Sequence, residues 1–112
     1  MGDYNDPRLG TEMKAPEIRG GRAVMKPAGR FDYSCLRQFR GHCTTCVEDP
    51  QVRSIEIDFG SVTYMDSSIL GMLLMLLERA DAAKKTVLLS HCHGTPREIL
   101  AIAGFEQLFE IT

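Results

Sequence analysis

The chain of 112 residues contains no tryptophan, and aromatic residues make up only 7% of it. Its formal net charge of −2 shows no large excess of either sign. Single-stranded nucleic acids stack on aromatic side chains and nucleic acids in general bind a positive surface, so this composition argues against that class. The longest apolar run, Met72–Leu77, is far too short to cross a bilayer, and the polar residues 1–8 do not resemble a signal peptide. We expect a soluble, cytoplasmic protein without direct membrane insertion.

The composition is that of one ordinary globular domain. Hydrophobic residues make up 44% and charged residues 25% of the chain. A chain of 112 residues can bury one core and does not need a metal or disulfides to remain folded. Residues 1–10 are rich in Gly, Asp, Asn and Pro and are predicted to form a flexible tail, so the domain is expected to span residues 11–112.

A β-hairpin and a helix are predicted at the start of the domain. The hairpin arms are Thr11–Arg19 and Arg22–Met25, and Gly20-Gly21 supplies a two-residue turn that tolerates positive φ. Asp32 is expected to cap a helix over Tyr33–Val47, because its carboxylate can accept hydrogen bonds from free backbone N–H groups.

The middle of the chain is predicted to form strand, helix and strand. Alternating apolar and polar side chains predict a strand over Val52–Phe59, and Gly60–Met65 is interpreted as a connection. A long helix is predicted over Ser67–Lys84, and its first half has almost no polar face. Such a helix is either buried on most sides or presents an apolar face to a partner. Thr86–Ser90 is predicted as a short apolar strand.

The C-terminal part of the chain is predicted to form a last helix. Thr95 is the expected N-cap, Pro96 the first helical residue and Glu98 the end of a capping box, while Gly104 ends the helix. The alternation of strands and helices predicts an α/β fold, with a mixed sheet of four to five strands and three to four helices packed on it. The residues expected to pack the C-terminus onto the core are Phe105, Leu108, Phe109 and Ile111.

The segment Asp66-Ser67-Ser68 precedes the apolar helix and has two interpretations. Either Asp66 or Ser67 can be the helix N-cap, which is the more common use of such a sequence. The N-terminus of a helix is also electropositive and favours anions, so a serine placed there could carry a phosphate.

This segment lies within a stretch that resembles a known family. Ile55–Leu73 is similar to the signature of STAS domains, the sulfate-transporter and anti-sigma-factor-antagonist domains. Gly29-Arg30-Phe31-Asp32 resembles the Gly-x-x-Asp turn that precedes the first helix of that family. Thr95–Glu98, together with Gly104-Phe105 and Leu108-Phe109, resembles its C-terminal helix and end. The resemblance covers residues 11–112 and implies a single STAS-like domain.

The resemblance also implies a function. It implies an anti-sigma factor antagonist (anti-anti-sigma factor), which is a non-enzymatic partner-switching regulator without a cofactor. Ser67 matches the phosphorylated serine of that family, with Ser68 as the second choice. The unphosphorylated form would bind an anti-sigma factor that is also a GHKL-type serine kinase, phosphorylation would release it, and a PP2C-type phosphatase would reverse the change. The implied partner-binding residues are Asp66, Ser67, Ser68, Ile69, Met72 and Asp32.

One departure from the family pattern supports an alternative function. Ile69 stands where the family usually has glycine, and we expect its side chain to reshape the partner surface or restrict kinase access. The alternative is a STAS-only accessory subunit of a lipid-transport ATP-binding-cassette (ABC) system, which is not phosphorylated. Ile69 favours this alternative, whereas the intact Asp66-Ser67-Ser68 favours the switch. In either case a monomer or a weak dimer is expected, because the hairpin leaves an exposed sheet edge.

The cysteines and histidines offer a third interpretation of the chain, as a zinc-binding or redox protein. Cys43 and Cys46 form a Cys-x-x-Cys pair, but a second such pair is missing and both are expected to face the core side of their helix. Buried, reduced thiols are therefore predicted, with no metal site. The other residues that could serve as zinc ligands are His42, His91, Cys92 and His93.

Overall fold

A computed structural model describes residues 13–112 of the chain. The tail predicted over residues 1–10 and the start of the first hairpin arm lie outside the described residues. The described part forms a five-stranded sheet, a two-stranded sheet and three α-helices, which confirms the predicted α/β class. None of these helices combines the length and the apolar character needed to cross a membrane.

The main sheet is mixed, with strand order β1-β2-β4-β6-β7. β1 pairs antiparallel with β2 through the predicted Gly20-Gly21 turn, and the remaining neighbours are parallel. β6 has the predicted limits, whereas β1 and β4 are shorter than predicted and β7 was not predicted. The strands are β1 (Glu17–Arg19), β2 (Arg22–Met25), β4 (Ser54–Asp58), β6 (Thr86–Ser90) and β7 (Glu110–Ile111).

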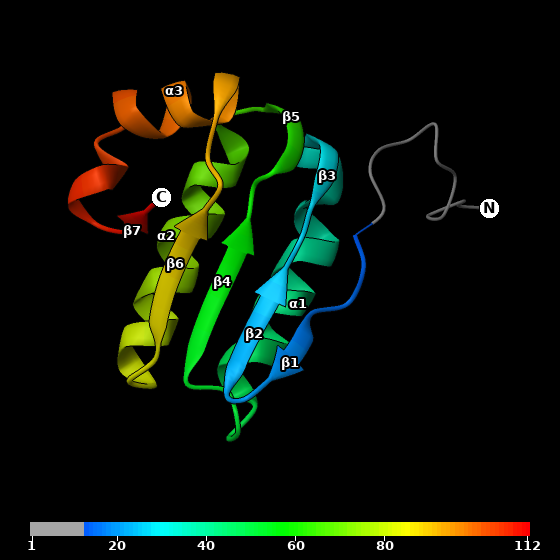
Figure 1. The fold of residues 1–112 in the computed structure, drawn as a ribbon, viewed down its shortest axis with the longest axis vertical. Helices are drawn as coiled ribbons and strands as arrows, with labels where there is room; N and C mark the ends of the chain where they lie inside the picture. The colour runs from blue at the N-terminus through cyan, green and yellow to red at the C-terminus, as the bar shows by residue number, and fades with distance from the viewer. Residues whose placement is uncertain (1–12) are drawn as a thin grey trace.

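Two further strands form a small parallel sheet beyond the ends of β2 and β4 (Figure 1). They are β3 (Ala28–Phe31) and β5 (Ser61–Met65), and their register shifts between Gly29 and Arg30. The interpretation of Gly60–Met65 as a mere connection was therefore wrong. The buried side chains of β5 do not alternate regularly, so the sequence lacks the period-two signal of a strand.

Two helices, α1 (Leu36–Glu48) and α2 (Ser68–Ala82), lie side by side on one face of the main sheet (Figure 1). α1 follows a 3-10 turn, η2 (Tyr33–Cys35), so the predicted helix exists but its first turn is tighter. The core between the sheet and the two helices is apolar, and the ring of Phe31 packs edge-on against Phe39 at a centroid distance of 4.9 Å. Its fully buried members include Ile55, Ile57, Leu73, Leu76 and Leu89.

The last helix, α3 (Gly94–Ile102), lies at the end of the sheet and is followed by a 3-10 turn, η3 (Phe105–Gln107). It begins with His93 at the N-cap and Thr95 inside it, so the predicted capping box was wrong. Gly94 has a φ of +60°, which lets the chain turn into the helix two residues earlier than predicted.

The end of α3 and the C-terminal segment largely follow the prediction. Gly104 follows the helix with a φ of +75°, as expected for a glycine at a helix end. Phe105 and Phe109 are buried, as predicted, and their rings stack on each other at a centroid distance of 5.4 Å. Leu108 is 51% exposed, so its predicted core position was wrong.

Candidate phosphorylation and partner-binding site

The segment Asp66-Ser67-Ser68 lies where β5 ends and α2 begins, beside the turn from β3 into η2. One carboxylate oxygen of Asp66 accepts hydrogen bonds from the backbone N–H of Ser68, at 3.0 Å, and from the Ser68 hydroxyl. Its other oxygen accepts a hydrogen bond from the backbone N–H of Tyr33 at 3.3 Å. Asp66 therefore provides the side-chain cap of α2 and also joins the starts of the two neighbouring helices.

The two serines of the motif are in different states. Ser67 is exposed at the N-cap position, and its side chain makes no capping hydrogen bond. Ser68 is half-buried, and its hydroxyl donates to Asp66. The Ser67 hydroxyl is thus the accessible one, at a helix end where backbone dipoles favour negative charge.

Asp32 caps the 3-10 turn before α1, as predicted. It is only 2% exposed, and its carboxylate accepts hydrogen bonds from the backbone N–H and the hydroxyl of Ser34 and from Arg30. Burial alone would raise the pKa of Asp32, but the Ser34 hydrogen bonds and the Arg30 guanidinium outweigh it and lower the pKa. Direct contact between Asp32 and a partner conflicts with this burial, and the side chain instead fixes the turn that carries Tyr33.

Ile69 and Met72 occupy different places on α2. Ile69 is fully buried, so the expectation that it reshapes the partner surface was wrong. The helix begins with its Ile69 side facing the sheet, where an apolar side chain adds to the core. Met72 is 8% exposed and lies on the wall of a groove between α1 and α2.

Two exposed tyrosines near the motif were missed by the sequence analysis. Tyr33, whose backbone N–H is held by Asp66, is 70% exposed, and Tyr64 at the end of β5 is 42% exposed. The Arg30 guanidinium lies 4.9 Å from the centre of the Tyr64 ring. Exposed aromatic side chains are enriched in protein interfaces. The position of Tyr64 depends on strand β5 and that of Tyr33 on the 3-10 turn η2, neither of which was predicted.

The cysteines are buried, free thiols, as predicted. Burial raises the pKa of Cys43 to about 12 and those of Cys46 and Cys92 to about 11, and it also raises the pKa of Cys35. Since the thiolate is the form that attacks electrophiles and binds metals, these side chains are poorly suited to either role.

One group of side chains with metal-ligand chemistry exists among residues 13–112, on the sheet face opposite α1 and α2. Potential ligand atoms of Glu56, Asp58 and His91 lie within 4.8 Å of one another. Glu56 already pairs with Arg22 at 3.0 Å and accepts the Ser90 hydroxyl, while Asp58 lies 3.1 Å from Nδ1 of His91. The carboxylates of this group thus already have hydrogen-bond or ion-pair partners. The Cys-x-x-Cys pair, Cys43 and Cys46, is not part of the group.

Comparisons with known proteins agree with this architecture. The family model described as "Mlab, STAS domain" matches residues 15–110. A STAS-domain containing protein of Pseudomonas aeruginosa is 37% identical over 97 residues, which cover 87% of this chain and 94% of that protein.

Solved structures give the same fold. An anti-sigma factor antagonist from Mycobacterium paratuberculosis matches with a TM-score of 0.80 and 17% identity, covering 91% of this chain and 85% of that one. The Bacillus cell fate determinant SpoIIAA in its phosphorylated form matches with a TM-score of 0.70 and 19% identity, covering 92% and 91%. At these identities the structural matches establish the fold, and the family match over residues 15–110 establishes that the chain belongs to the STAS domain family.

Proposed function

We propose that this chain is an anti-sigma factor antagonist, a non-enzymatic cytoplasmic regulator whose partner binding is switched by phosphorylation of Ser67. The observation that carries the proposal is the difference between the two serines. Ser67 presents an exposed hydroxyl at the start of α2, while the Ser68 hydroxyl is held by Asp66. The likeness to SpoIIAA, whose structure is known in unphosphorylated and phosphorylated forms, supports the proposal.

The electrostatics of the site suit a switch that leaves the fold intact. A phosphate adds about −1.5 to −2 charge, and the N-terminus of α2 favours such a charge. The same charge would stand beside Asp66 and the exposed Tyr33, in the surface offered to a partner. Binding would therefore change while folding would not, and a difference of a few kcal/mol in partner affinity is enough to switch a complex.

The partners follow from this role. The unphosphorylated chain would bind an anti-sigma factor that is also a GHKL-type serine kinase and supplies the phosphate from ATP. A PP2C-type phosphatase would remove it. Asp66, Ser67 and Ser68 would lie at the centre of the interface with Met72 at its margin, while buried Asp32 and Ile69 would support the interface from below.

Phosphopeptide mapping of the protein from its own host tests the proposal. Trypsin cleavage after Arg53 and Arg79 isolates the peptide Ser54–Arg79, which contains the whole motif. We expect phosphate on Ser67, lost in Ser67→Ala and retained in the matched control Ser68→Ala. Absence of phosphate under every growth condition, with an ABC-type ATPase co-purifying, would overturn the switch and support the accessory-subunit alternative.

A further inference from the structure

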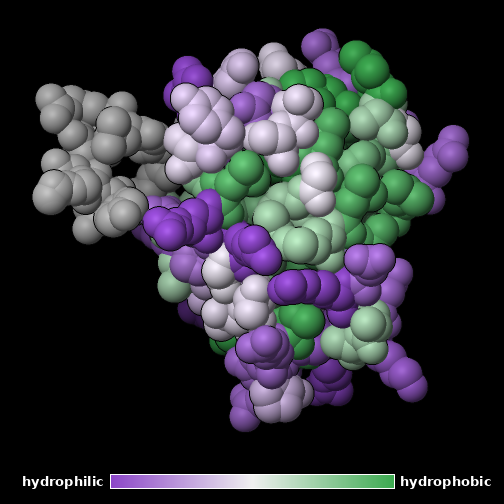
Figure 2. All heavy atoms as spheres, turned by 180° about the vertical axis from the view of Figure 1, so that it is seen from behind, coloured by the Kyte–Doolittle hydropathy of each residue, from purple (hydrophilic) through white to green (hydrophobic). Residues whose placement is uncertain are grey.

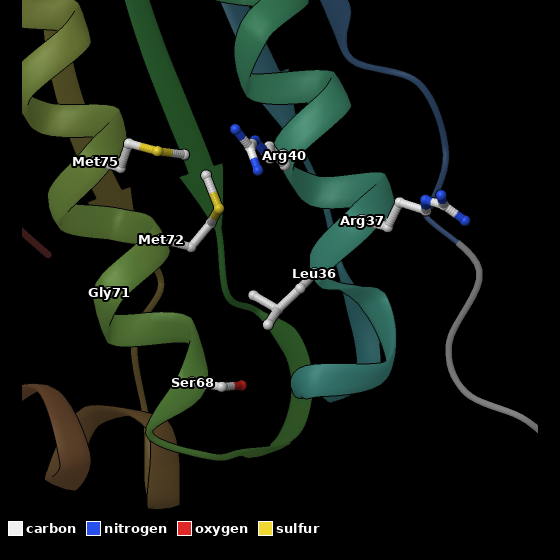
Figure 3. Close-up of a pocket in the computed structure, with 7 residues that line it drawn as sticks. All are labelled: Leu36, Arg37, Arg40, Ser68, Gly71, Met72 and Met75. Atoms are coloured by element: carbon white, nitrogen blue, oxygen red, sulfur yellow. The ribbon is translucent and has the colours of Figure 1, made fainter.

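A groove of about 460 Å³ lies between α1 and α2, next to the Ser67 site. Leu36 on α1 and Met72 and Met75 on α2 point into the gap between the two helices (Figure 3). Ser68 and Gly71 complete the α2 side of the groove. Methionine side chains adapt their shape to what they contact, so such walls suit an apolar ligand surface.

The surroundings of the groove are apolar as well. Leu74, one turn further along α2 than Leu70, is 42% exposed, and Leu70 and Met75 are half-buried. Figure 2 shows a hydrophobic area over this side of the molecule. The groove is therefore part of a larger apolar surface of the kind that protein interfaces use.

The charge of this face is opposite to that of the chain. Residues 36–47 of α1 contain no acidic residue, and residues 67–77 of α2 contain no charged residue. Arg40 is the arginine directed toward the groove, whereas Arg37 points away from it (Figure 3). Arg40 is exposed, and its guanidinium lies over the gap near Met75 (Figure 3). It is in none of the ion pairs formed within residues 13–112. The chain as a whole carries −2, so the groove is a local positive region.

We propose that this groove binds an acidic amphipathic helix of a partner protein. The apolar side of that helix would pack on Leu36, Met72 and Met75, and its carboxylates would pair with Arg40. Helices commonly bind in apolar grooves in this way, and complementary charge sets their orientation and choice of partner. Which protein supplies the helix depends on the proposed function. The acidic and apolar character of the helix is inferred from the residues of the groove alone.

The position of the groove explains how a phosphate would release such a partner. Ser67 precedes Gly71, a groove residue, by four residues, which is about 6 Å along the axis. This separation is shorter than the Debye length of about 8 Å at physiological ionic strength. A phosphate on Ser67 would therefore repel those carboxylates of the bound helix that lie over Gly71. The Arg40 guanidinium near Met75, about 12 Å along the axis from Ser67, is beyond this range.

Two synthetic helical peptides provide the test, one with a leucine face and a glutamate face and the other with lysine in place of glutamate. In ¹H–¹⁵N NMR titrations of the full chain, we expect the acidic peptide to shift the amides of groove residues. We expect Arg40→Glu to weaken its binding at least tenfold and to strengthen binding of the lysine peptide. Arg19→Glu, the same charge change on β1, is the matched control and should leave both affinities unchanged.

A second variant tests the groove by shape. Gly71→Leu should block the groove, because a Cβ at Gly71 has no heavy atom within 4 Å and a larger side chain can be accommodated. Gly41→Leu, at an equally open site on α1 outside the groove, is its control. Equal binding of the two peptides, or shifts confined to other surfaces, would overturn the proposal. The peptide titrations do not depend on phosphorylation. Failure of the groove proposal can therefore be distinguished from failure of the Ser67 switch.

Discussion

Replacement of Ile69 by alanine distinguishes a core role from a surface role for this residue. The side chain is fully buried, and the substitution removes three carbon atoms beyond Cβ. At about 0.8 kcal/mol for each buried methylene-sized group, the lost transfer free energy is about 2.4 kcal/mol. The unfilled cavity adds to this loss, so we expect the free energy of unfolding to fall by about 3 kcal/mol.

Urea denaturation followed by circular dichroism measures this difference, since a single domain of this size is expected to unfold in one transition. Leu74→Ala is the matched control, because Leu74 lies on the same helix but is 42% exposed. We expect that control to cost less than about 1 kcal/mol. A cost for Ile69→Ala no larger than that of the control would refute the burial argument and return Ile69 to the partner surface.

Three further predictions concern the caps and the thiols. Asp66→Ala should lower the free energy of unfolding by about 1 kcal/mol, whereas Ser67→Ala, which removes no cap, should change it by less than about 0.5 kcal/mol in the same denaturation assay. Asp32→Asn should destabilise the chain at pH 7. The folded-state pKa of Asp32 is lowered, so its stabilisation is present above the ordinary value of 3.8 and lost as pH falls through the folded-state pKa. The free energies of unfolding of wild type and variant should therefore converge as the pH falls in acid denaturation. A difference that stays constant with pH would contradict this. The thiols, with Cys43 near a pKa of about 12, should react with a disulfide reagent at pH 8 at least 100-fold more slowly in native than in unfolded protein.

Local sequence patterns predicted the elements that have strong periodicity. The alternation in Ile55–Phe59 and the apolar run Thr86–Ser90 correspond to β4 and β6, and the long apolar helix was found within a few residues of its limits. β3 and β5 were missed because they are defined by pairing with each other across the chain, which no local pattern contains. β7 is a two-residue strand and depends on its contact with β6 in the same way.

The candidate site was located from the sequence, but the roles within it were not. The sequence allowed either Asp66 or Ser67 as the helix cap. Only the hydrogen bonds in the structure show that Asp66 is the residue whose side chain caps α2. The first half of α2 is apolar on almost every side, so the pattern could not tell that Ile69 faces the core while Leu74 faces outward. The exposure of Tyr33 depends on the 3-10 turn that Asp32 caps, which the sequence predicted as regular helix.

Control of partner binding by phosphate on Ser67 is tested most directly by comparing how much partner each form of the chain recovers. Tagged chain with unmodified Ser67 and tagged chain with phosphoserine incorporated at position 67 are incubated with extract of the host. Bound proteins are then quantified by mass spectrometry. A chain with phosphoserine at exposed position 61 is the control. We predict that a GHKL-type kinase is recovered with the unmodified chain and with the control, and falls at least tenfold with phosphoserine at 67. Equal recovery of the same partner with all three chains would contradict the account.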